Sequence, residues 1–293
     1  MMSKLQGAMT IDVEDYFQVE AFAKLVDRNK WDSYERRVAG STRKALSLFQ
    51  QHDAKATFFI LGWVAEREPE LVREILAAGH EVASHGYAHQ HVCGLTPEQF
   101  REDIVRAKGI LEDIGGCAVQ GYRAPCFSID QDNHWAHEII METGHQYSSS
   151  IYPIKHDLYG VPNAPTEPFR LPNGLLEIPA STLPLGGKNL PISGGGYFRL
   201  LPLMISQWAL KQHAKRHGQV VFYFHPWELD TEQPRMVDAS RKSKFRHYLN
   251  LDRMEPRLSK LLNSLQWQSM ADLYLTPDKT YPVVDWRSVK QAS

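Results

Sequence analysis

Short apolar runs alternate with amphipathic stretches along most of the chain. Each bounded apolar run predicts a buried strand, and each stretch with helical spacing and end signals predicts a helix. The predicted strands cover residues 8–13, 56–61, 81–84, 119–122, 147–151 and 220–224. The predicted helices cover residues 41–51, 69–78, 96–114, 132–143, 201–217 and 253–265, with Ser41 as the expected N-cap of the first. This alternation favours an α/β fold of parallel strands joined by crossover helices.

The middle of the chain departs from this alternation. Residues 152–197 are rich in Pro and Gly and include the run Gly194-Gly195-Gly196. We expect loops and short antiparallel strands here, inserted into the parallel array. No linker-like stretch separates two units, so the pattern predicts one barrel-like domain over residues 1–293.

Composition and charge narrow the class of protein. Of the 293 residues 43% are hydrophobic, which is enough for a sizeable core. The formal net charge of −1 gives no field that favours nucleic acid. Three cysteines without repeated spacing, Cys93, Cys117 and Cys126, indicate reduced thiols. No apolar run approaches the roughly 20 residues of a membrane helix, and residues 1–7 lack the apolar region of a signal peptide, so we expect a cytoplasmic protein.

Two groups of polar residues follow the first and third predicted strands, where βα barrels collect catalytic groups. Asp12, Glu14 and Asp15 are carboxylates that repel one another unless a cation or a base role compensates. His85 and His89 are four residues apart, so on a helical turn both imidazoles face one way and suit one divalent metal ion. A carboxylate from the first group would complete a set with open positions for water. Taken alone, the three carboxylates also fit a solvated acidic turn, and the two histidines also fit a pair of surface histidines.

Two further groups follow later strands. Arg123 ends the predicted strand 119–122 and can hold a buried carboxylate ionised, although an ordinary ion pair at a strand end is the alternative. His225 ends the aromatic strand 220–224, where it suits general acid chemistry on a leaving amine. The aromatic neighbours of His225 could pack against a sugar face, but a structural histidine at the barrel rim has the same pattern.

The order of these groups along the chain resembles the polysaccharide deacetylase (NodB-homology) family. An acidic turn, His-x-x-x-His, Arg-x-Pro and a late His-Pro follow one another over about residues 8–230, which leaves residues 231–293 as a C-terminal extension. The strings DVEDYFQVEAF, SHGYAHQHV, GYRAPCFSI, GGGYFR and FHPWELD are similar to the branch associated with bacterial exopolysaccharide gene clusters. The resemblance implies a distorted (β/α) barrel with fewer than eight strands.

The resemblance also implies roles for individual residues. A divalent metal ion, usually Zn²⁺, is expected on His85 and His89, with Asp12 as general base, Arg123 as its charge partner and His225 as general acid. Many relatives have adjacent aspartates in the first motif, whereas Val13 separates the two carboxylates here. We therefore assign the third metal ligand to Glu14, with Asp15 as the alternative. Extended residues two apart share a face, which favours Asp12 and Glu14 acting together.

A second departure concerns Ser148, because the family usually has an aspartate there that orients and charges the acid histidine. Serine cannot stabilise an imidazolium by charge. Either Asp157 or Glu228 replaces that aspartate, or activity is reduced.

The resemblance implies a metal-dependent hydrolase that removes N-acetyl groups from an amino-sugar polysaccharide or its precursor, in exopolysaccharide or cell-envelope metabolism. The expected partners are an N-acetylated glycan and, at the periphery, membrane-linked glycan machinery. Two alternatives stay open: hydrolysis of another non-peptide C–N bond, as in a cyclic ureide or a formamide, and a non-catalytic glycan-binding relative. Oligomeric state is not indicated.

Overall fold

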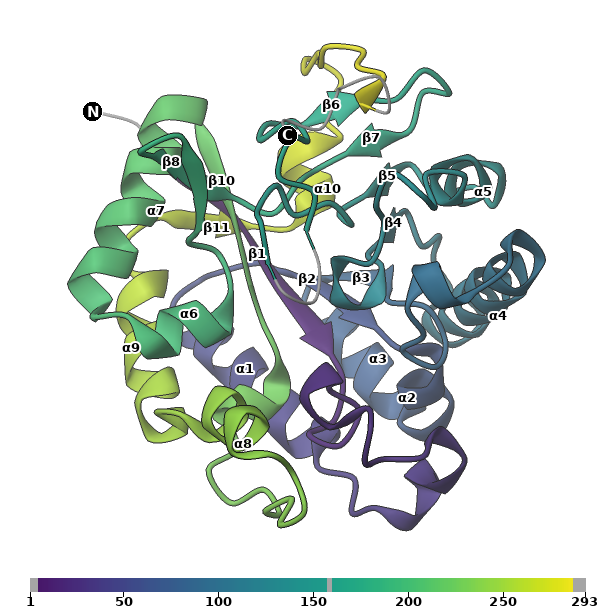
Figure 1. Cartoon of the computed structure of the whole chain (residues 1–293), viewed down its shortest axis with the longest axis vertical. Coiled ribbons are helices and arrows are strands. Elements are labelled where there is room, and N and C mark those ends of the chain that lie inside the picture. Colours follow the sequence, from purple (N-terminus) through teal and green to yellow (C-terminus); the bar gives the residue numbers. More distant parts are fainter. Residues whose placement is uncertain (1–4, 157–159, 287–293) are drawn as a thin grey trace.

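A computed structural model describes residues 5–156 and 160–286. Its main element is a curled mixed sheet with helices packed around it (Figure 1). Along its path the sheet runs β10-β1-β2-β3-β4-β5-β7, and every neighbouring pair in this run is parallel. These strands are β1 Gln6–Val13, β2 Thr57–Ile60, β3 Glu81–Ser84, β4 Gly121–Tyr122, β5 Tyr147–Ser148, β7 Leu176–Glu177 and β10 Gln219–Phe224.

Seven parallel strands on an open, curled path match the expected distorted (β/α) barrel with fewer than eight strands. Two short strands extend the sheet within the described residues, for nine in all. The antiparallel β6 (Phe169–Arg170) continues beyond β7, and β11 (Gln266–Gln268) pairs with β1. A separate hairpin of β8 (Thr182–Leu185) and β9 (Lys188–Pro191) supplies the short antiparallel pair expected in the middle segment.

Helices α1–α5 and α7 pack around the outside of the sheet, whereas α10 packs against its inner face (Figure 1). Their bounds are α1 Val38–Gln51, α2 Gly62–Arg67, α3 Pro69–Ala77, α4 Pro97–Gly115, α5 Ala136–Glu142, α6 Gly195–Leu200, α7 Leu203–His217, α8 Arg241–Tyr248, α9 Met254–Leu262 and α10 Met270–Tyr274. None of the helices in the described part of the chain combines the length and apolarity needed to cross a bilayer.

Strand β1 shows how the alternation of side chains positions the site. Met9, Ile11 and Val13 belong to the main core between the sheet and the surrounding helices. On the opposite face, Ala8 packs inside the barrel against α10, while Thr10 and Asp12 meet the buried side chain of Arg123. Because successive strand residues point to opposite faces, the polar residues of β1 are directed into the barrel interior.

Several predicted elements need correction. Ser41 does not cap α1, because it lies inside that helix and donates to the carbonyl of Arg37 at 3.0 Å. The amides of Arg37 and Val38 donate instead to the carboxylate of Asp15, at 2.7 and 2.9 Å. The Gly194-Gly195-Gly196 run, predicted as a loop, leads into α6. The helix expected over 253–265 is not the last, because β11 and α10 follow it.

Candidate functional site

The candidate site lies where the carboxyl ends of β1, β3, β4 and β10 meet. Asp12 belongs to the end of β1, whereas His85, Arg123 and His225 each come directly after a strand. A cavity of about 540 Å³ opens there. Its lining includes Asp12, Glu14, His85, His89, His225, Trp227 and Glu228. The sheet order makes this convergence necessary, because β10 returns from late in the chain to pair with β1 and places Phe224 opposite Ile11.

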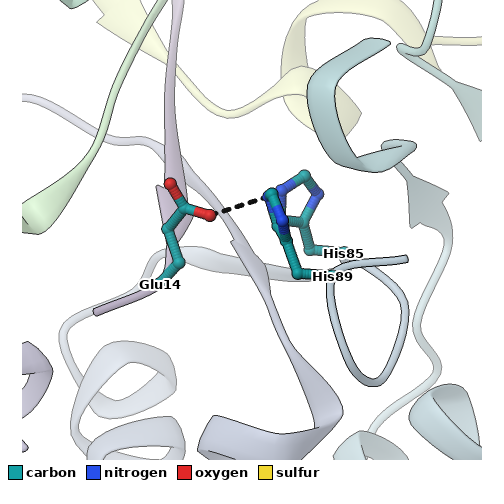
Figure 2. Close-up of side chains that lie close together, drawn as sticks. All are labelled: Glu14, His85 and His89. Atoms are coloured by element: carbon teal, nitrogen blue, oxygen red, sulfur yellow. Dashed lines mark ion pairs between the residues drawn. The ribbon is translucent and has the colours of Figure 1, made fainter. Parts of the chain in front are cut away.

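Glu14, His85 and His89 form a compact group (Figure 2), and all three line this cavity. Each offers one ligand atom, and the three atoms lie within 4.8 Å of one another. Oε2 of Glu14 is 2.8 Å from Nε2 of His89. Nδ1 of His85 lies 2.8 Å from the carbonyl oxygen of Arg123, a contact that fixes the ring and directs Nε2 of His85 away from that carbonyl.

The backbone between the two histidines is not the helical turn that the spacing predicted. Residues 85–90 form an irregular bend after β3, with positive φ angles of 72° at Gly86 and 50° at His89. A Cβ at position 86 would come 2.7 Å from Oδ2 of Asp103, which also accepts the amide of Tyr87. The prediction of a helix here is wrong, because the left-handed residues turn the chain more tightly than a helix does and still bring both rings together.

The chemistry of this group fits a divalent metal ion. Within residues 5–156 and 160–286, Oε2 of Glu14 is buried and makes no hydrogen bond of acceptable geometry, although Nε2 of His89 lies 2.8 Å away, and a cation between the two atoms would satisfy both. Burial raises the pKa of Glu14, but the charges of His89, His225 and His85 outweigh it and bring that pKa to about 2. Burial lowers the pKa of His85 to about 4, so its imidazole is neutral and able to act as a ligand.

Arg123 holds Asp12 beside this group. Its Nη1 lies 2.6 Å from Oδ1 of Asp12 and 2.9 Å from the hydroxyl of Thr10. The guanidinium is fully buried, donates to both the carbonyl and the hydroxyl of Ser149, and lies 4.1 Å from the ring centre of Phe59. The ion pair therefore fixes the carboxylate of Asp12 on a rigid support at the cavity.

His225 is paired with a carboxylate from its own segment. Its Nδ1 lies 2.9 Å from Oε1 of Glu228, and its Nε2 lies 3.6 Å from Oε1 of Glu14. Burial lowers the pKa of His225, but the hydrogen bond to Glu228 and the charges of Glu14 and Glu228 raise it overall, to about 9. At neutral pH this histidine is therefore an imidazolium that can donate a proton from Nε2.

Glu228 is in turn held by Arg199 of α6. Nε of Arg199 lies 2.6 Å from Oε2 of Glu228. Burial raises the pKa of Glu228, yet Arg199 and His225 bring it down to about 2, which keeps the carboxylate charged. A Cβ at position 195 would lie 2.2 Å from Oε1 of Glu228, so this close approach requires glycine. The GGGYFR string thus supplies both the glycine and the arginine that accommodate Glu228.

The position that resembles the family's aspartate takes no part in this pairing. The hydroxyl of Ser148 donates to the hydroxyl of Ser150 at 2.8 Å, and that oxygen accepts the amide of Ala124. Of the two replacements predicted from the sequence, Glu228 is the one in contact with His225, whereas Asp157 lies outside the described residues.

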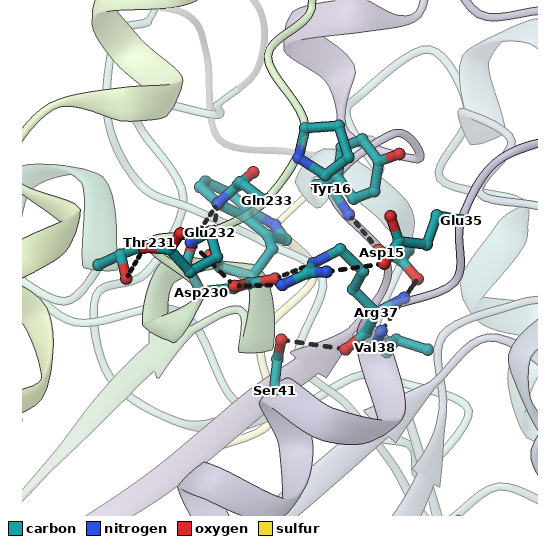
Figure 3. A network of polar contacts seen from close by, with 12 residues as sticks. Asp15, Tyr16, Glu35, Arg37, Val38, Ser41, Asp230, Thr231, Glu232 and Gln233 are labelled. Atoms are coloured by element: carbon teal, nitrogen blue, oxygen red, sulfur yellow. Dashed lines mark hydrogen bonds and ion pairs between the residues drawn. The ribbon is translucent and has the colours of Figure 1, made fainter.

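Asp15, the alternative metal ligand, belongs instead to a polar network with Arg37 and Val38 (Figure 3). Besides the amides of Arg37 and Val38, it accepts the amide of Tyr16 at 2.9 Å. The side chain of Arg37 continues the network by binding Asp230. Burial, opposed by these three amides, raises the pKa of Asp15 to about 6. The geometry groups Glu14, and not Asp15, with the two histidines, and Asp15 serves as a long-range cap of α1.

Sequence reasoning indicated aromatic residues beside His225 but missed His247, which joins them in the wall of the cavity. The ring of Trp227 stacks between His225 and His247, with ring centres 5.2 and 4.1 Å apart, and its Nε1 donates to Oε1 of Glu14 at 3.3 Å. Trp227 lay in a quoted string, but His247 belongs to α8 in the C-terminal extension and had no motif to mark it. Nε2 of His247 lies 2.6 Å from Oε1 of Gln233. The extension therefore builds part of the cavity.

Two sequence families match consecutive parts of the chain. The family described as polysaccharide deacetylase matches residues 31–148, and the one described as a domain of unknown function (DUF3473) matches residues 149–275. His85, His89 and Arg123 lie in the first part, whereas His225 and Glu228 lie in the second. The parallel sheet takes strands from both parts, since β5 pairs with β7.

Curated relatives align with part of the chain. The peptidoglycan-N-acetylglucosamine deacetylase of Bacillus cereus is 35% identical over 98 residues, which cover 33% of this chain and 36% of that protein. The peptidoglycan deacetylase of Helicobacter pylori is 30% identical over 108 residues, which cover 37% of this chain and 36% of that protein. The alignments thus span about a third of the length of these relatives.

Solved structures share the fold over nearly the whole chain. A candidate polysaccharide deacetylase of Mycobacterium smegmatis has a TM-score of 0.63 at 18% identity, with 96% of this chain and 94% of that chain covered. An allantoinase has a TM-score of 0.60 at 16% identity, with 94% and 92% covered. At these low identities the structural similarity shows only that the chain has the same barrel fold. The chemistry must be argued from the side chains.

Proposed function

We propose that the chain belongs to the polysaccharide deacetylase family, whose model matches residues 31–148, and that it is a metal-dependent hydrolase that removes N-acetyl groups from an amino-sugar polymer or its precursor. The observation that carries the proposal is one cavity with three groups in it. These are the Glu14, His85 and His89 cluster, the Asp12–Arg123 pair and the His225–Glu228 pair. They correspond to a cation site, a general base and a general acid.

Each group has a defined task in amide hydrolysis. Glu14, His85 and His89 would hold the divalent cation, for which Zn²⁺ suits two nitrogens and one carboxylate, and the cation supplies polarisation of the acetyl carbonyl and of water. Asp12, fixed by Arg123, takes a proton from the attacking water. His225 gives a proton to the departing nitrogen. The amide C–N bond breaks, and the products are acetate and a free amine on the sugar.

The direct test is acetate release from N-acetylated glucosamine oligomers. We expect release by the purified chain, loss of release with a chelator, and recovery when Zn²⁺ is added back. Release that persists through complete metal removal would overturn the metal-dependent mechanism.

A ligand substitution tests the cation site itself. At the free Zn²⁺ concentration that half-fills the Glu14, His85 and His89 site of the wild type, we expect His85→Ala to bind roughly a fifth of that metal or less, because loss of even a supporting group typically costs about 10–100-fold in affinity. Metal content by elemental analysis is the measurement. His52→Ala is the control, since His52 hydrogen-bonds Ser259 and Asn263 far from the cavity. Full occupancy in His85→Ala would show that the ligand assignment is incorrect.

The two alternative functions are separable by the same assay. The allantoinase likeness concerns the fold, so a cyclic ureide remains a second substrate class to be tested beside the oligomers. Phe245 lines the cavity with an exposed ring and favours a sugar, because sugar faces pack on aromatic rings. The complete set of acid, base and metal groups supports an enzyme over a non-catalytic glycan binder.

We also propose that the protein works in exopolysaccharide or cell-envelope metabolism, on the cytoplasmic side and at the surface of membrane-linked glycan machinery. All three cysteines are free thiols, as the cytoplasmic side requires. Apolar side chains of α6 and α7 are exposed, and α8 carries four cations without an acid, a combination that suits an anionic membrane surface. The apolar residues are Leu200, Met204, Ile205 and Trp208, and the cations are Arg241, Lys242, Lys244 and Arg246.

Sedimentation with vesicles tests this contact. We expect the chain to bind vesicles that contain anionic lipid, and the double variant Met204→Ser, Trp208→Ser to bind several-fold more weakly, since the exposed apolar area is removed. Val105→Ser on α4 is the matched control, because Val105 is 51% and Trp208 53% exposed. Equal binding by all three proteins, or no binding by the wild type, would contradict the proposed membrane contact. It would not affect the proposed hydrolase activity.

A further inference from the structure

A second group of metal-binding residue types lies in the wall of the same cavity. Glu20, His91 and Cys126 place one carboxylate oxygen, one imidazole nitrogen and one sulfur within 4.8 Å of one another. They come from three segments: the short helix Glu20–Phe22, the loop after β3 and the short helix Pro125–Phe127. Acetyl transfer as argued above uses none of the three.

We propose that Glu20, His91 and Cys126 bind a second divalent cation of the thiophilic class, such as Zn²⁺ or Co²⁺. One sulfur, one nitrogen and one oxygen are a donor set that such ions accept, whereas Mg²⁺ and Ca²⁺ require oxygen. The inference concerns cation binding, so it stands whether or not the first site catalyses deacetylation.

The contacts within the group support a cation. Nε2 of His91 lies 2.9 Å from Oε2 of Glu20, and this nitrogen is buried without a hydrogen bond of acceptable geometry in the described chain. Both atoms can turn toward one ion between them. The side chains of Glu20 and His91 are about a quarter to a third exposed, at 30% and 26%, so an ion can enter from solvent.

The charges around Cys126 keep its thiol protonated as long as no cation is bound. Burial, followed by the carboxylates of Glu20, Glu14 and Asp12, raises the pKa of its thiol well above the ordinary value. A bound cation reverses this preference, and the thiol proton leaves to solvent as the sulfur binds. Glu20 and the resulting thiolate then carry two negative charges, which neutralise a divalent ion.

One positive group opposes the ion. Arg28 influences both Glu20 and Cys126, but its guanidinium is already engaged with the carbonyl oxygens of Ala88 and His89, at 2.9 Å each. Because Arg28 remains in place, we expect the second site to bind more weakly than the cluster of Glu14 with its two histidines. The carboxylates of Asp12 and Glu14 partly offset this repulsion.

Sulfur gives the two sites different spectra. Cobalt(II) bound to a thiolate shows a charge-transfer band in the near ultraviolet, and Glu14, His85 and His89 contain no sulfur to produce it. We therefore expect metal-free protein to take up two equivalents of Co²⁺, with the thiolate band growing during the second. Cys126→Ser should take up one equivalent and show no band.

Controls separate this site from other thiols and from the first site. Cys93→Ser and Cys117→Ser should keep the band, since both of these cysteines are exposed and neither belongs to the group. His85→Ala should lose the first equivalent but keep the band, so failure of the proposed catalytic site would be visible separately. No band in the wild type at excess Co²⁺, or a band that survives Cys126→Ser, overturns the second site.

Glu20→Gln supplies a variant that leaves the sulfur in place. We expect its band to appear at Co²⁺ concentrations about tenfold or more higher, because a charged ligand is lost. Wild-type affinity in this variant would contradict a ligand role for Glu20. Circular dichroism of each variant checks that the fold is retained.

Discussion

Asp12→Asn should lower the rate of acetate release by about 10²–10⁴-fold while the metal content stays at the wild-type level. The amide oxygen of asparagine can still accept from Arg123, which lies 2.6 Å from Oδ1 of Asp12. Position and packing are therefore preserved, and the ability to take a proton from water is removed. Turnover and metal content measured on the same preparation test the two halves of this expectation.

Asp15→Asn is the matched control, because Asp15 is an equally buried acid three residues away. Its oxygens accept three backbone amides, and asparagine has one oxygen for them, so we expect a loss of about 1–3 kcal/mol in stability. Turnover per folded molecule should stay close to the wild type. Near-normal turnover in Asp12→Asn, together with a large loss in Asp15→Asn, would transfer the base role to Asp15.

The strands and the order of the site groups were predictable because both rest on local patterns. Apolar runs marked the main strands, and polar residues at or directly after the ends of β1, β3, β4 and β10 marked the mouth of the barrel. The Thr96-Pro97 start of α4 was also visible, and Thr96 and Gln99 form the reciprocal cap there. Such signals depend on neighbours within a few residues, which a single sequence contains.

The failures involve partners that are distant in sequence. Ser41 has the residue type of an N-cap, but Asp15 reaches the first amides of α1 from 22 residues away and makes a local cap unnecessary. His247 comes to the cavity only because α8 packs against the loop after β10, and its own neighbours are charged residues of ordinary pattern. No periodic pattern along the chain predicts these contacts, because they are set by tertiary packing.

The bend between His85 and His89 was missed for a different reason. The four-residue spacing was taken as one helical turn, whereas left-handed residues at Gly86 and His89 produce a tighter path. Glycine at 86 was a signal that could have indicated this, because it favours positive φ and weakens a helix. The ligand prediction did not depend on the helix, since either path brings the two imidazoles to one side.

Glu228→Gln should move the alkaline limb of the pH–rate profile to lower pH and reduce activity most above neutrality. A general acid must be protonated, so activity governed by His225 falls as pH rises through its pKa, which Glu228 and Glu14 raise to about 9. A cation bound to Glu14 would neutralise that carboxylate, so the charge of Glu228 would then be the one that raises the pKa of His225. If the limb moves to the ordinary histidine value of about 6.5, roughly 1% of the acid remains protonated at pH 8.5.

The measurement is kcat/KM against pH for Glu228→Gln and for the wild type. We expect a loss of roughly 10²-fold at pH 8.5 that shrinks toward pH 6, where even an unsupported histidine is largely protonated. Glu232→Gln is the control, because Glu232 is a nearby exposed acid whose described contacts lie outside the cavity. An equal loss at every pH would indicate structural damage to the Arg199 contact in place of a lost charge.

Ser148→Asp decides between a relocated carboxylate and an impaired acid. If Glu228 supplies the charge, a new aspartate beside Ser150 adds a buried negative group without a task, and activity should stay flat or fall. If the acid histidine lacks a partner in the working enzyme, the same change should raise activity near neutrality and extend the alkaline limb. A gain in Ser148→Asp combined with no loss in Glu228→Gln would reject the pairing as the source of acidity. The opposite pair of results follows from a Glu228 that stands 2.9 Å from His225 and is kept charged by Arg199.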